Sequence, residues 1–359
     1  MMKKCRVGLV GLGSVAQICH LPAYINAKNI EVAAGAEIRK EVLQQVSADW
    51  GFKGYSNYEE MLDKEKLDIV CILTGPRISR RIAEHAAECK INVFVEKPMA
   101  LSLEDARAII DTCKGEKVKL FYGETYRFFP TVKKAAEMIK EGYLGDIHLL
   151  LETLIGGTGE EHFECCDIYP PGAPGAGGWG LTDHGIHLVD TFRWLTKSDV
   201  DWVFGRGLRA GHKPETEFLT LQLKNGAIGQ LIYNEATFHS DMPYEGMFSW
   251  GSYGAKGVSR WESYPGNFRI HGSRGALRVF LFPNKMYYFS KEKVEEIGIE
   301  DFPFPAPWGL QIESFADSIL NDTEPEITGI DGFKALQVIL AAYESFETKK
   351  IVEINPPLK

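Results

Sequence analysis

The stretch RVGLVGLGSVA, residues 6–16, decides the fold prediction for the first part of this chain. A short apolar run, typical of a buried strand, leads into a Gly-x-Gly-x-x-Ala turn that opens a helical pattern. Gly11 permits a tight turn, Gly13 lets the backbone approach a pyrophosphate, and Ala16 lets helix and strand pack closely. Backbone N–H groups and the helix dipole would then face the phosphate charge. The stretch predicts the first strand–turn–helix unit of a dinucleotide-binding domain.

Strand-like and helical patterns alternate through the first 125 residues. Apolar, β-branched runs predict strands at the following ranges: 6–10, 30–36, 67–73, 92–96 and 119–123. Helical patterns separate these runs at 14–25, 39–49, 79–89 and 103–113. Such alternation is typical of βαβ units around a parallel sheet. Residues 1–125 are therefore predicted to be a Rossmann domain with a doubly wound parallel sheet.

The pattern changes after Pro130. Several β-like runs follow one another, and turn signals such as Asn225-Gly226 and residues 272–275 separate neighbouring runs as in antiparallel hairpins. Helical patterns at 131–141, 183–195, 310–320 and 332–347 accompany them. We therefore predict that residues 126–359 form an α+β domain with a mostly antiparallel sheet.

Composition narrows the class of protein. The chain has 359 residues, 45% of them hydrophobic, and a formal net charge of −9, which makes nucleic acid and an anionic membrane surface poor partners. Seven cysteines without a Cys-x-x-Cys pair suggest reduced thiols and a cytoplasmic protein. The basic start at residues 3–4 lacks the apolar segment of a signal peptide, and we expect no membrane span.

A carboxylate after the second predicted strand points to the cofactor. Glu37 stands where it could accept hydrogen bonds from both hydroxyls of an adenosine ribose, and it would repel a 2′-phosphate, which favours NAD. Arg39 could instead pair with that phosphate, which keeps NADP open; the plainer alternative is that Glu37 only begins a solvated helix. We expect cofactor contacts from Gly11, Gly13, Ser14, Val15, Ala16, Glu37, Arg39, Thr74, Glu96 and Lys97.

Three side chains are candidates for the chemistry. EKP at residues 96–98 ends the strand at 92–96, at the carboxyl edge where ligands of parallel sheets bind. Because a proline follows it, Lys97 is predicted to be a positioned cation. Asp183 and His187 are four residues apart in a helical pattern and would share a helix face. An imidazole with a pKa of about 6.5 suits proton exchange with a hydroxyl, so these three residues are predicted to be catalytic.

Taken in order along the chain, the motifs resemble the glucose–fructose oxidoreductase/inositol dehydrogenase (Gfo/Idh/MocA) family. The resemblance covers essentially the whole chain. It is carried by the turn at 11–16, EKP at 96–98, RFFP at 127–130, EGYLG at 141–145, residues 178–190, GSRGAL at 272–277, EP at 324–325, DG at 331–332, AL at 335–336 and AYES at 342–345. Family members transfer hydride between a nicotinamide cofactor and a secondary hydroxyl or ketone of a sugar, cyclitol or related polyol.

The resemblance carries further expectations. It implies that Lys97, Asp183 and His187 are the catalytic residues and that the peptide bond after Lys97 is cis. It also implies that the second domain, residues 126–359, binds substrate and forms a homodimer or homotetramer through its open sheet. Two departures stand out. Residues 74–79 read TGPRIS where the family often has Thr-Pro-Asn and then a histidine, which puts the nicotinamide-side contacts in question. Lys90 replaces a common glycine, so its turn is expected to differ.

The expected mechanism assigns one role to each candidate. His187 removes the hydroxyl proton, Lys97 steadies the developing alkoxide, and Asp183 orients His187 or a neighbouring hydroxyl beside the nicotinamide. Tyr126 and Trp179 are candidates for lining the substrate pocket, although simple packing is an equal alternative for Trp179.

Two other interpretations remain open at this point. His184 and His187, three residues apart, could join Asp183 as metal ligands, but hydride transfer to nicotinamide needs no metal and we expect none. The chain could also bind dinucleotide and sugar without catalysis, as a sensor or regulator. Retention of the lysine, the aspartate and the histidine favours the enzyme.

Overall fold

The structure is a computed structural model that describes residues 3–155, 180–210, 213–234, 267–281, 284–300 and 304–355. The chain divides into two compact units. Unit 1 comprises Met1–Phe128 and Pro303–Leu336, and unit 2 comprises Phe129–Phe302 and Gln337–Lys359. The segment Pro303–Leu336, which the sequence prediction placed in the second domain, thus packs in unit 1.

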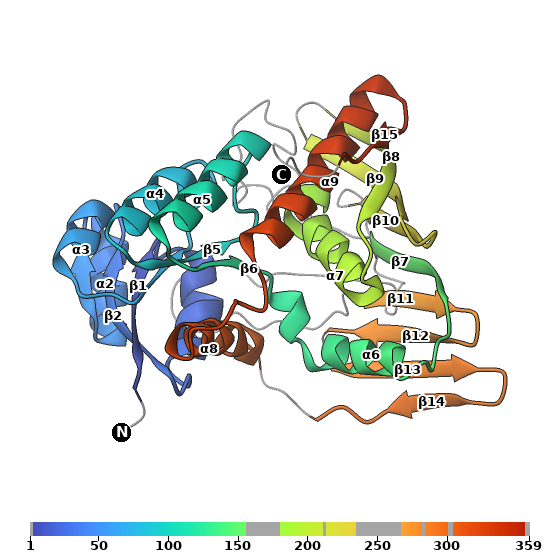
Figure 1. The fold of residues 1–359 in the computed structure, drawn as a ribbon, viewed down its shortest axis with the longest axis horizontal. Helices are drawn as coiled ribbons and strands as arrows, with labels where there is room; N and C mark the ends of the chain where they lie inside the picture. Colours follow the sequence, from blue (N-terminus) through green and yellow to red (C-terminus); the bar gives the residue numbers. More distant parts are fainter. Residues whose placement is uncertain are drawn as a thin grey trace. The chain divides into compact units, whose positions relative to one another are not determined.

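Unit 1 is built on a parallel sheet with the strand order β3-β2-β1-β4-β5-β6 (Figure 1). The strands are β1 (Cys5–Val10), β2 (Ile30–Ala36), β3 (Lys53–Tyr55), β4 (Ile69–Ile72), β5 (Asn92–Glu96) and β6 (Leu120–Gly123). The order reverses between β1 and β4, and ligands of open α/β sheets bind at such a switch point, outside the carboxyl ends of the strands. The predicted doubly wound parallel sheet is confirmed.

Helices accompany both faces of this sheet; Figure 1 shows α4 and α5 on one side and α8 on the other. Their bounds are η1 (Ala16–His20), α1 (Leu21–Tyr24), α2 (Lys40–Trp50), α3 (Tyr58–Lys64), α4 (Ser79–Glu88), α5 (Leu103–Glu116), η2 (Thr125–Phe128) and α8 (Ala306–Leu320). The single helix predicted at 14–25 is a π-helical turn, η1, followed by α1. Sequence analysis missed β3 and α3, which are too short to show a clear period.

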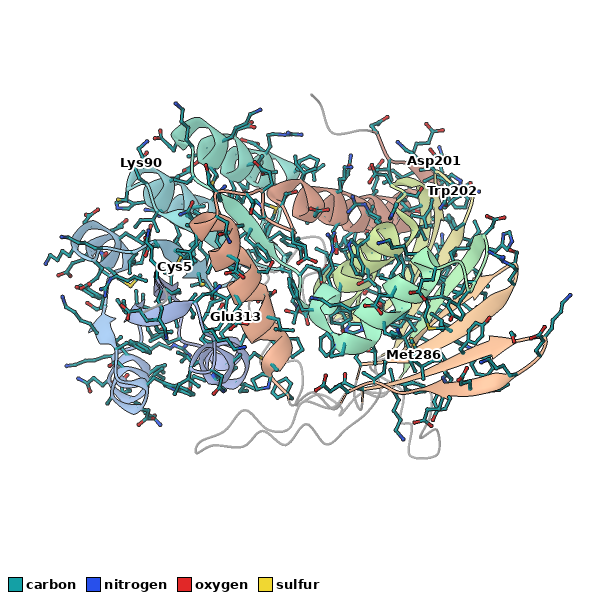
Figure 2. The ribbon with its side chains drawn as sticks, turned by 60° about the horizontal axis from the view of Figure 1, so that its bottom comes forward. Cys5, Lys90, Asp201, Trp202, Met286 and Glu313 are labelled. Carbon is teal, nitrogen blue, oxygen red and sulfur yellow. The ribbon has the colours of Figure 1, made fainter. Side chains whose placement is uncertain are left out.

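Contacts with the residues just before β2 explain why α8 belongs to unit 1. Glu313, labelled in Figure 2, accepts a hydrogen bond from the Lys28 N–H at 2.6 Å. Asn29 Nδ2 donates to Asp317 Oδ1 at 2.7 Å and also to the Glu313 carbonyl. These polar contacts surround a buried apolar side that includes Ile312 and Phe315. A helix distant in sequence therefore completes the core of the first unit.

Unit 2 contains a sheet with the order β14-β13-β12-β11-β7-β10-β9-β8-β15. Its strands are β7 (Ile147–Ile155), β8 (Val200–Ala210), β9 (Lys213–Leu223), β10 (Ile228–Asn234), β11 (Asn267–Gly272), β12 (Gly275–Phe280), β13 (Lys285–Ser290), β14 (Val294–Ile297) and β15 (Val352–Glu353). Among these described strands, only β7 and β10 pair in parallel. The predicted mostly antiparallel sheet is confirmed.

The two faces of the unit 2 sheet differ in how deeply their side chains are buried. The helical elements of this part of the chain are α6 (Pro130–Lys140), η4 (Gly180–Gly185), α7 (Ile186–Thr196) and α9 (Gly329–Thr348), which begins in unit 1. The side chains of Leu150, Glu217 and Leu231, at alternate positions of β7, β9 and β10, are buried, whereas Leu151 and Ile232, on the other face, are half-buried.

Lys90 shows how the chain accommodates a departure from the family pattern. Its backbone lies in the left-handed region, at φ 61°, although it carries a side chain. The Ile91 N–H then bonds to the Ala86 carbonyl at 2.9 Å, which closes α4. A lysine here adopts the left-handed conformation that glycine favours. No helix in the described part of the chain is long and apolar enough to cross a membrane.

Candidate active site

The glycine turn after β1 has the geometry that the sequence predicts. Gly11 has φ 93°, and a Cβ on it would lie 2.7 Å from Thr74 Cγ2 and 3.0 Å from the Leu73 backbone. At Gly13 the nearest atom to an added Cβ is an Arg39 nitrogen at 3.7 Å, so the turn is open there. Gly11 is therefore required for packing against Thr74, and Gly13 leaves room for a ligand to approach the backbone.

The residues after the turn begin a helical segment. Ala16 is fully buried against the sheet, whereas Ser14 and Val15 are exposed. The first N–H groups of a helix have no partner within the helix, so they are available to an anion. The open backbone at Gly13 and these donors fit the pyrophosphate of a dinucleotide.

Glu37 lies directly after β2 and is buried, with 7% of its surface exposed. Its Oε2 accepts a hydrogen bond from the Leu12 N–H at 3.0 Å, and its Oε1 accepts from the Arg39 N–H at 3.0 Å. The Arg39 guanidinium holds both oxygens, at 2.9 and 3.0 Å. Burial alone would raise the pKa of Glu37, but the bonds from Arg39 and Leu12 outweigh it and lower the pKa. Glu37 is therefore an anion.

Arg39 thus lies on the carboxylate that the sequence predicts to bind a ribose. Its side chain is 57% exposed, so it can move away without unpacking the core. The alternative in which Glu37 is simply a solvated helix start does not describe this buried, fully engaged carboxylate.

Lys97 follows β5, at the carboxyl edge of the unit 1 sheet, and is half-buried. The expected cis peptide bond between Lys97 and Pro98 is present. The neighbouring Glu96 accepts a hydrogen bond from the Lys97 N–H through Oε2 at 3.0 Å, and its Oε1 lies 2.8 Å from His20 Nε2. Both Glu96 oxygens therefore have partners inside the protein.

A second acidic group lies at the same edge, and sequence analysis missed it. Glu124 follows β6, the neighbour of β5, and its side chain is completely buried. Burial raises the pKa of Glu124 to about 8, against the lowering effects of a bond from the Tyr126 N–H and of the Arg127 and Lys97 charges. Tyr126 itself is 8% exposed within η2. The available signal was an acid directly after a parallel strand.

Asp183 and His187 lie on one continuous helical stretch of unit 2. Asp183 belongs to the π-helical η4 and is half-buried; His187 belongs to α7 and is 8% exposed. Lys97, by contrast, belongs to unit 1.

Glu217 on β9 holds the start of this stretch. Its Oε2 accepts the Leu181 N–H at 2.7 Å, and its Oε1 accepts the Tyr343 hydroxyl at 3.0 Å. The Thr182 hydroxyl lies 3.0 Å from the same Tyr343 oxygen. An added Cβ on Gly180 would lie 2.2 Å from Glu217 Oε2, so glycine is required beside the carboxylate. The turn that carries Asp183 is therefore held by buried side chains.

Glu152 on β7 forms a second buried contact. Its Oε2 accepts the Tyr233 hydroxyl at 2.6 Å, and its Oε1 lies 3.1 Å from His184 Nε2. The His184 ring also lies edge-on to His187, with centroids 6.3 Å apart. The contacts of Glu152 and Tyr233 were not predicted, because their partners lie far away in the sequence.

The metal alternative finds no support in this arrangement. His184 directs Nε2 to Glu152 instead of presenting it beside His187. Within the described ranges, the group of potential ligands that come within 4.8 Å of one another is Asp63, His85 and Cys89, on the surface of α3 and α4.

Trp179, a predicted substrate contact, lies outside the described residues.

Comparison with known proteins identifies the family. The model for the NAD-binding Rossmann fold of the Gfo/Idh/MocA oxidoreductases matches residues 5–124, and that for their C-terminal alpha/beta domain matches residues 171–354. The chain belongs to the Gfo/Idh/MocA family. The predictions of this family, of an oxidoreductase and of NAD as cofactor are therefore confirmed.

Individual Gfo/Idh/MocA relatives match along nearly their whole length. Myo-inositol 2-dehydrogenase of Thermotoga maritima is 26% identical, over 98% of each chain. NADP-dependent D-xylose 1-dehydrogenase of Haloarcula marismortui is 25% identical, over 98% of this chain and 93% of its own. The solved structure of scyllo-inositol dehydrogenase from Lactobacillus casei, with NAD(H) and scyllo-inositol bound, has a TM-score of 0.77 at 23% identity, covering 98% of this chain and 99% of that one. This last likeness shows the shared fold.

Proposed function

We propose that this protein transfers hydride between a nicotinamide cofactor and a secondary hydroxyl or ketone of a sugar, cyclitol or related polyol. The observation that carries the proposal is the position of Lys97 at the carboxyl edge of the unit 1 sheet, the edge that also presents the glycine turn and Glu37. The substrate class comes from the inositol and xylose dehydrogenases among its relatives.

The proposed chemistry divides the work among three side chains. His187 removes the proton of the substrate hydroxyl as the carbinol carbon loses hydride and becomes a carbonyl. Lys97 stabilises the oxygen as it gains negative charge, and Asp183 orients His187 or a neighbouring hydroxyl. When bound, NAD supplies the nicotinamide carbon that accepts the hydride. Tyr126 and Trp179 are proposed to contact the substrate.

We also propose that NAD is preferred over NADP. The support is the anionic, buried Glu37, which attracts two ribose hydroxyls and repels a phosphate. Proposed contacts to the cofactor further include Gly11, Gly13, Ser14, Val15, Ala16, Arg39, Thr74, Glu96 and Lys97.

A spectrophotometric screen tests the function. Sugars, cyclitols, sugar acids and nucleotide sugars are each mixed with protein and NAD or NADP, and the absorbance of reduced nicotinamide is followed. We expect turnover of at least one compound, abolished in Lys97→Ala and retained in Lys64→Ala, which removes an exposed lysine on α3. Tight dinucleotide binding without turnover of any compound would contradict the proposal and favour a sensor.

We propose a cytoplasmic homodimer or homotetramer that forms through the unit 2 sheet. One face of this sheet carries half-buried apolar side chains from neighbouring strands, including Leu151 on β7, Phe218 on β9 and Ile232 on β10. Such a face favours a partner surface over water. Light scattering after size-exclusion chromatography should give a dimer or tetramer, and Ile232→Arg should shift it toward monomer; a monomeric wild type would refute the assembly.

A further inference from the structure

His20 is a buried histidine that the proposed mechanism does not use. It ends η1, the helical turn that follows the glycine turn, and none of its surface is exposed. Its Nε2 lies 2.8 Å from Glu96 Oε1, and its Nδ1 lies 2.9 Å from the Tyr24 hydroxyl. The ring also packs edge-on against Phe94, with centroids 5.9 Å apart. Both ring nitrogens therefore have partners inside the protein.

One placement of protons is consistent with the neighbours of His20. Burial raises the pKa of the Tyr24 hydroxyl and that of the Cys71 thiol well above their ordinary values, so both keep their protons at neutral pH. Cys71 Sγ lies 3.6 Å from the Tyr24 oxygen. In a consistent chain, the Cys71 S–H donates to that oxygen and the Tyr24 O–H donates to His20 Nδ1. The Nε2–H of His20 then donates to Glu96.

Glu96 connects this chain of hydrogen bonds to Lys97. It ends β5, and its side chain is 11% exposed. Because Oε1 faces His20 and Oε2 accepts the Lys97 N–H at 3.0 Å, the carboxylate is held from two sides. A carboxylate held in this way fixes the peptide from which the Lys97 side chain projects.

We propose that His20 is a positioning residue for Lys97: it holds the Glu96 carboxylate and thereby fixes the direction in which the Lys97 ammonium is presented. The inference rests on the proposed role of Lys97 in the reaction. It also links two parts of the site, because η1 starts at Ala16, beside the turn that fits a pyrophosphate, and ends at His20. The helical turn η1 then connects the cofactor turn to the hydrogen bonds that hold Glu96 and Lys97.

Two amide substitutions distinguish the contributions of the two ring nitrogens of His20. Glutamine places an N–H where Nε2 was and keeps the bond to Glu96, whereas asparagine is shorter and reaches only toward Tyr24. We expect His20→Asn to lower kcat by about 10- to 100-fold, because small displacements of a reacting group cost this much. His20→Gln should retain kcat within about threefold, and both should bind NADH with a Kd within about twofold of wild type.

Tyr24→Phe is the matched control, because it removes the partner of Nδ1 and leaves the bond from Nε2 to Glu96. We expect it to lower the melting temperature while kcat stays within about twofold. A purely structural role predicts a different result: His20→Asn, His20→Gln and Tyr24→Phe would all lose kcat in proportion to their loss of stability. That result would overturn the proposal.

A measurement made without substrate tests this inference independently of the proposed function. The rate at which acetic anhydride acetylates Lys97 is measured by mass spectrometry, with Lys64 as the internal reference. We expect His20→Asn, and not His20→Gln, to change the relative rate at Lys97 by at least about threefold, since lysine reactivity follows its surroundings. An unchanged rate in His20→Asn overturns the positioning role even in an active dehydrogenase. A changed rate in a protein that turns over no polyol supports the positioning role while the proposed function fails.

Discussion

His187 illustrates how a buried ionisable side chain can be placed by its own helix. It lies early in α7, just after the π-helical stretch that Glu217 holds through Leu181 and Tyr343. Its ring faces His184, which in turn contacts Glu152. The imidazole therefore packs against a second histidine, whose own position is fixed by Glu152.

Replacing His187 tests its role as the proton acceptor. His187→Gln should lower kcat by about 10²- to 10⁴-fold, the usual contribution of a general base, while the Kd for NADH stays near wild type. Steady-state kinetics and fluorescence titration give the two values. His85→Gln, a change at a half-buried histidine on α4 that belongs to no proposed site, serves as control and should leave kcat unaltered. Turnover at the wild-type rate would exclude this role for His187.

Glu37 is the residue from which we expect a preference for NAD over NADP. Glu37→Gln removes the charge while keeping most of the volume, so it weakens the bonds to the ribose hydroxyls and removes the repulsion of a 2′-phosphate. We expect kcat/KM with NAD to fall by about 10- to 100-fold, the worth of hydrogen bonds to a charged group. The value with NADP should rise, because Arg39 is released from the pair. A variant with an unchanged ratio of the two values would argue against this assignment.

At the scale of elements, two helices are followed by a lysine whose backbone is in the strained left-handed conformation. α5 ends at Glu116, and the following Lys117 has φ 59°; α7 is followed by Lys197 at φ 50°. The left-handed conformation costs a residue with a side chain about 1–2 kcal/mol. The bond from the Val118 N–H to the Cys113 carbonyl at 3.0 Å closes α5 in return.

The same substitution at two lysines of this region should have opposite effects. Lys117→Gly should raise the free energy of unfolding by about 0.5–1 kcal/mol, since the relieved strain exceeds the added freedom of the unfolded chain. Lys114→Gly, within α5, should lower it by about 0.5–1 kcal/mol, because glycine is a poor helix former. Urea denaturation measures both. Destabilisation by both substitutions would show that Lys117 is not strained.

At the scale of the whole molecule, Glu124 links stability to pH. The folded protein raises the pKa of Glu124 from an ordinary value of 4.5 to about 8, mainly by burial. Between these values the folded state binds more protons than the unfolded state, so this residue's contribution to stability falls as pH rises. It is fully favourable below about pH 4.5 and is lost by the time pH passes about 8.

Glu124→Gln removes this titration while preserving shape. We expect the variant to gain stability relative to wild type as pH rises from about 5 to 8, by a few kcal/mol in total, with no further change above that range. Urea denaturation at a series of pH values gives the difference. The exposed Glu300→Gln is the control and should show a flat difference. A flat difference for Glu124→Gln as well would mean that burial does not protonate this group.

Local patterns predicted much of this molecule. The strands at Ile30–Ala36 and Asn92–Glu96 have the predicted bounds, because buried parallel strands are short apolar runs bounded by turns. The open turn at Gly13 also follows from residue type and spacing alone. The roles of Lys97, Asp183 and His187 stay predictions, although the elements that carry them were correctly placed.

What the sequence by itself determined is the order of strands, turns and helices, and with it the family and the cofactor, because these depend on neighbouring residues. The tertiary structure alone decided which distant groups meet. The sequence around His20 does not indicate its contact with Glu96, and the sequence around Leu181 does not indicate its hydrogen bond to Glu217. The packing of α8 into unit 1 and the burial of Glu124 were likewise decided by the tertiary structure alone. Such contacts depend on how separate segments pack, and a buried polar group becomes stable only when its partner arrives with another element.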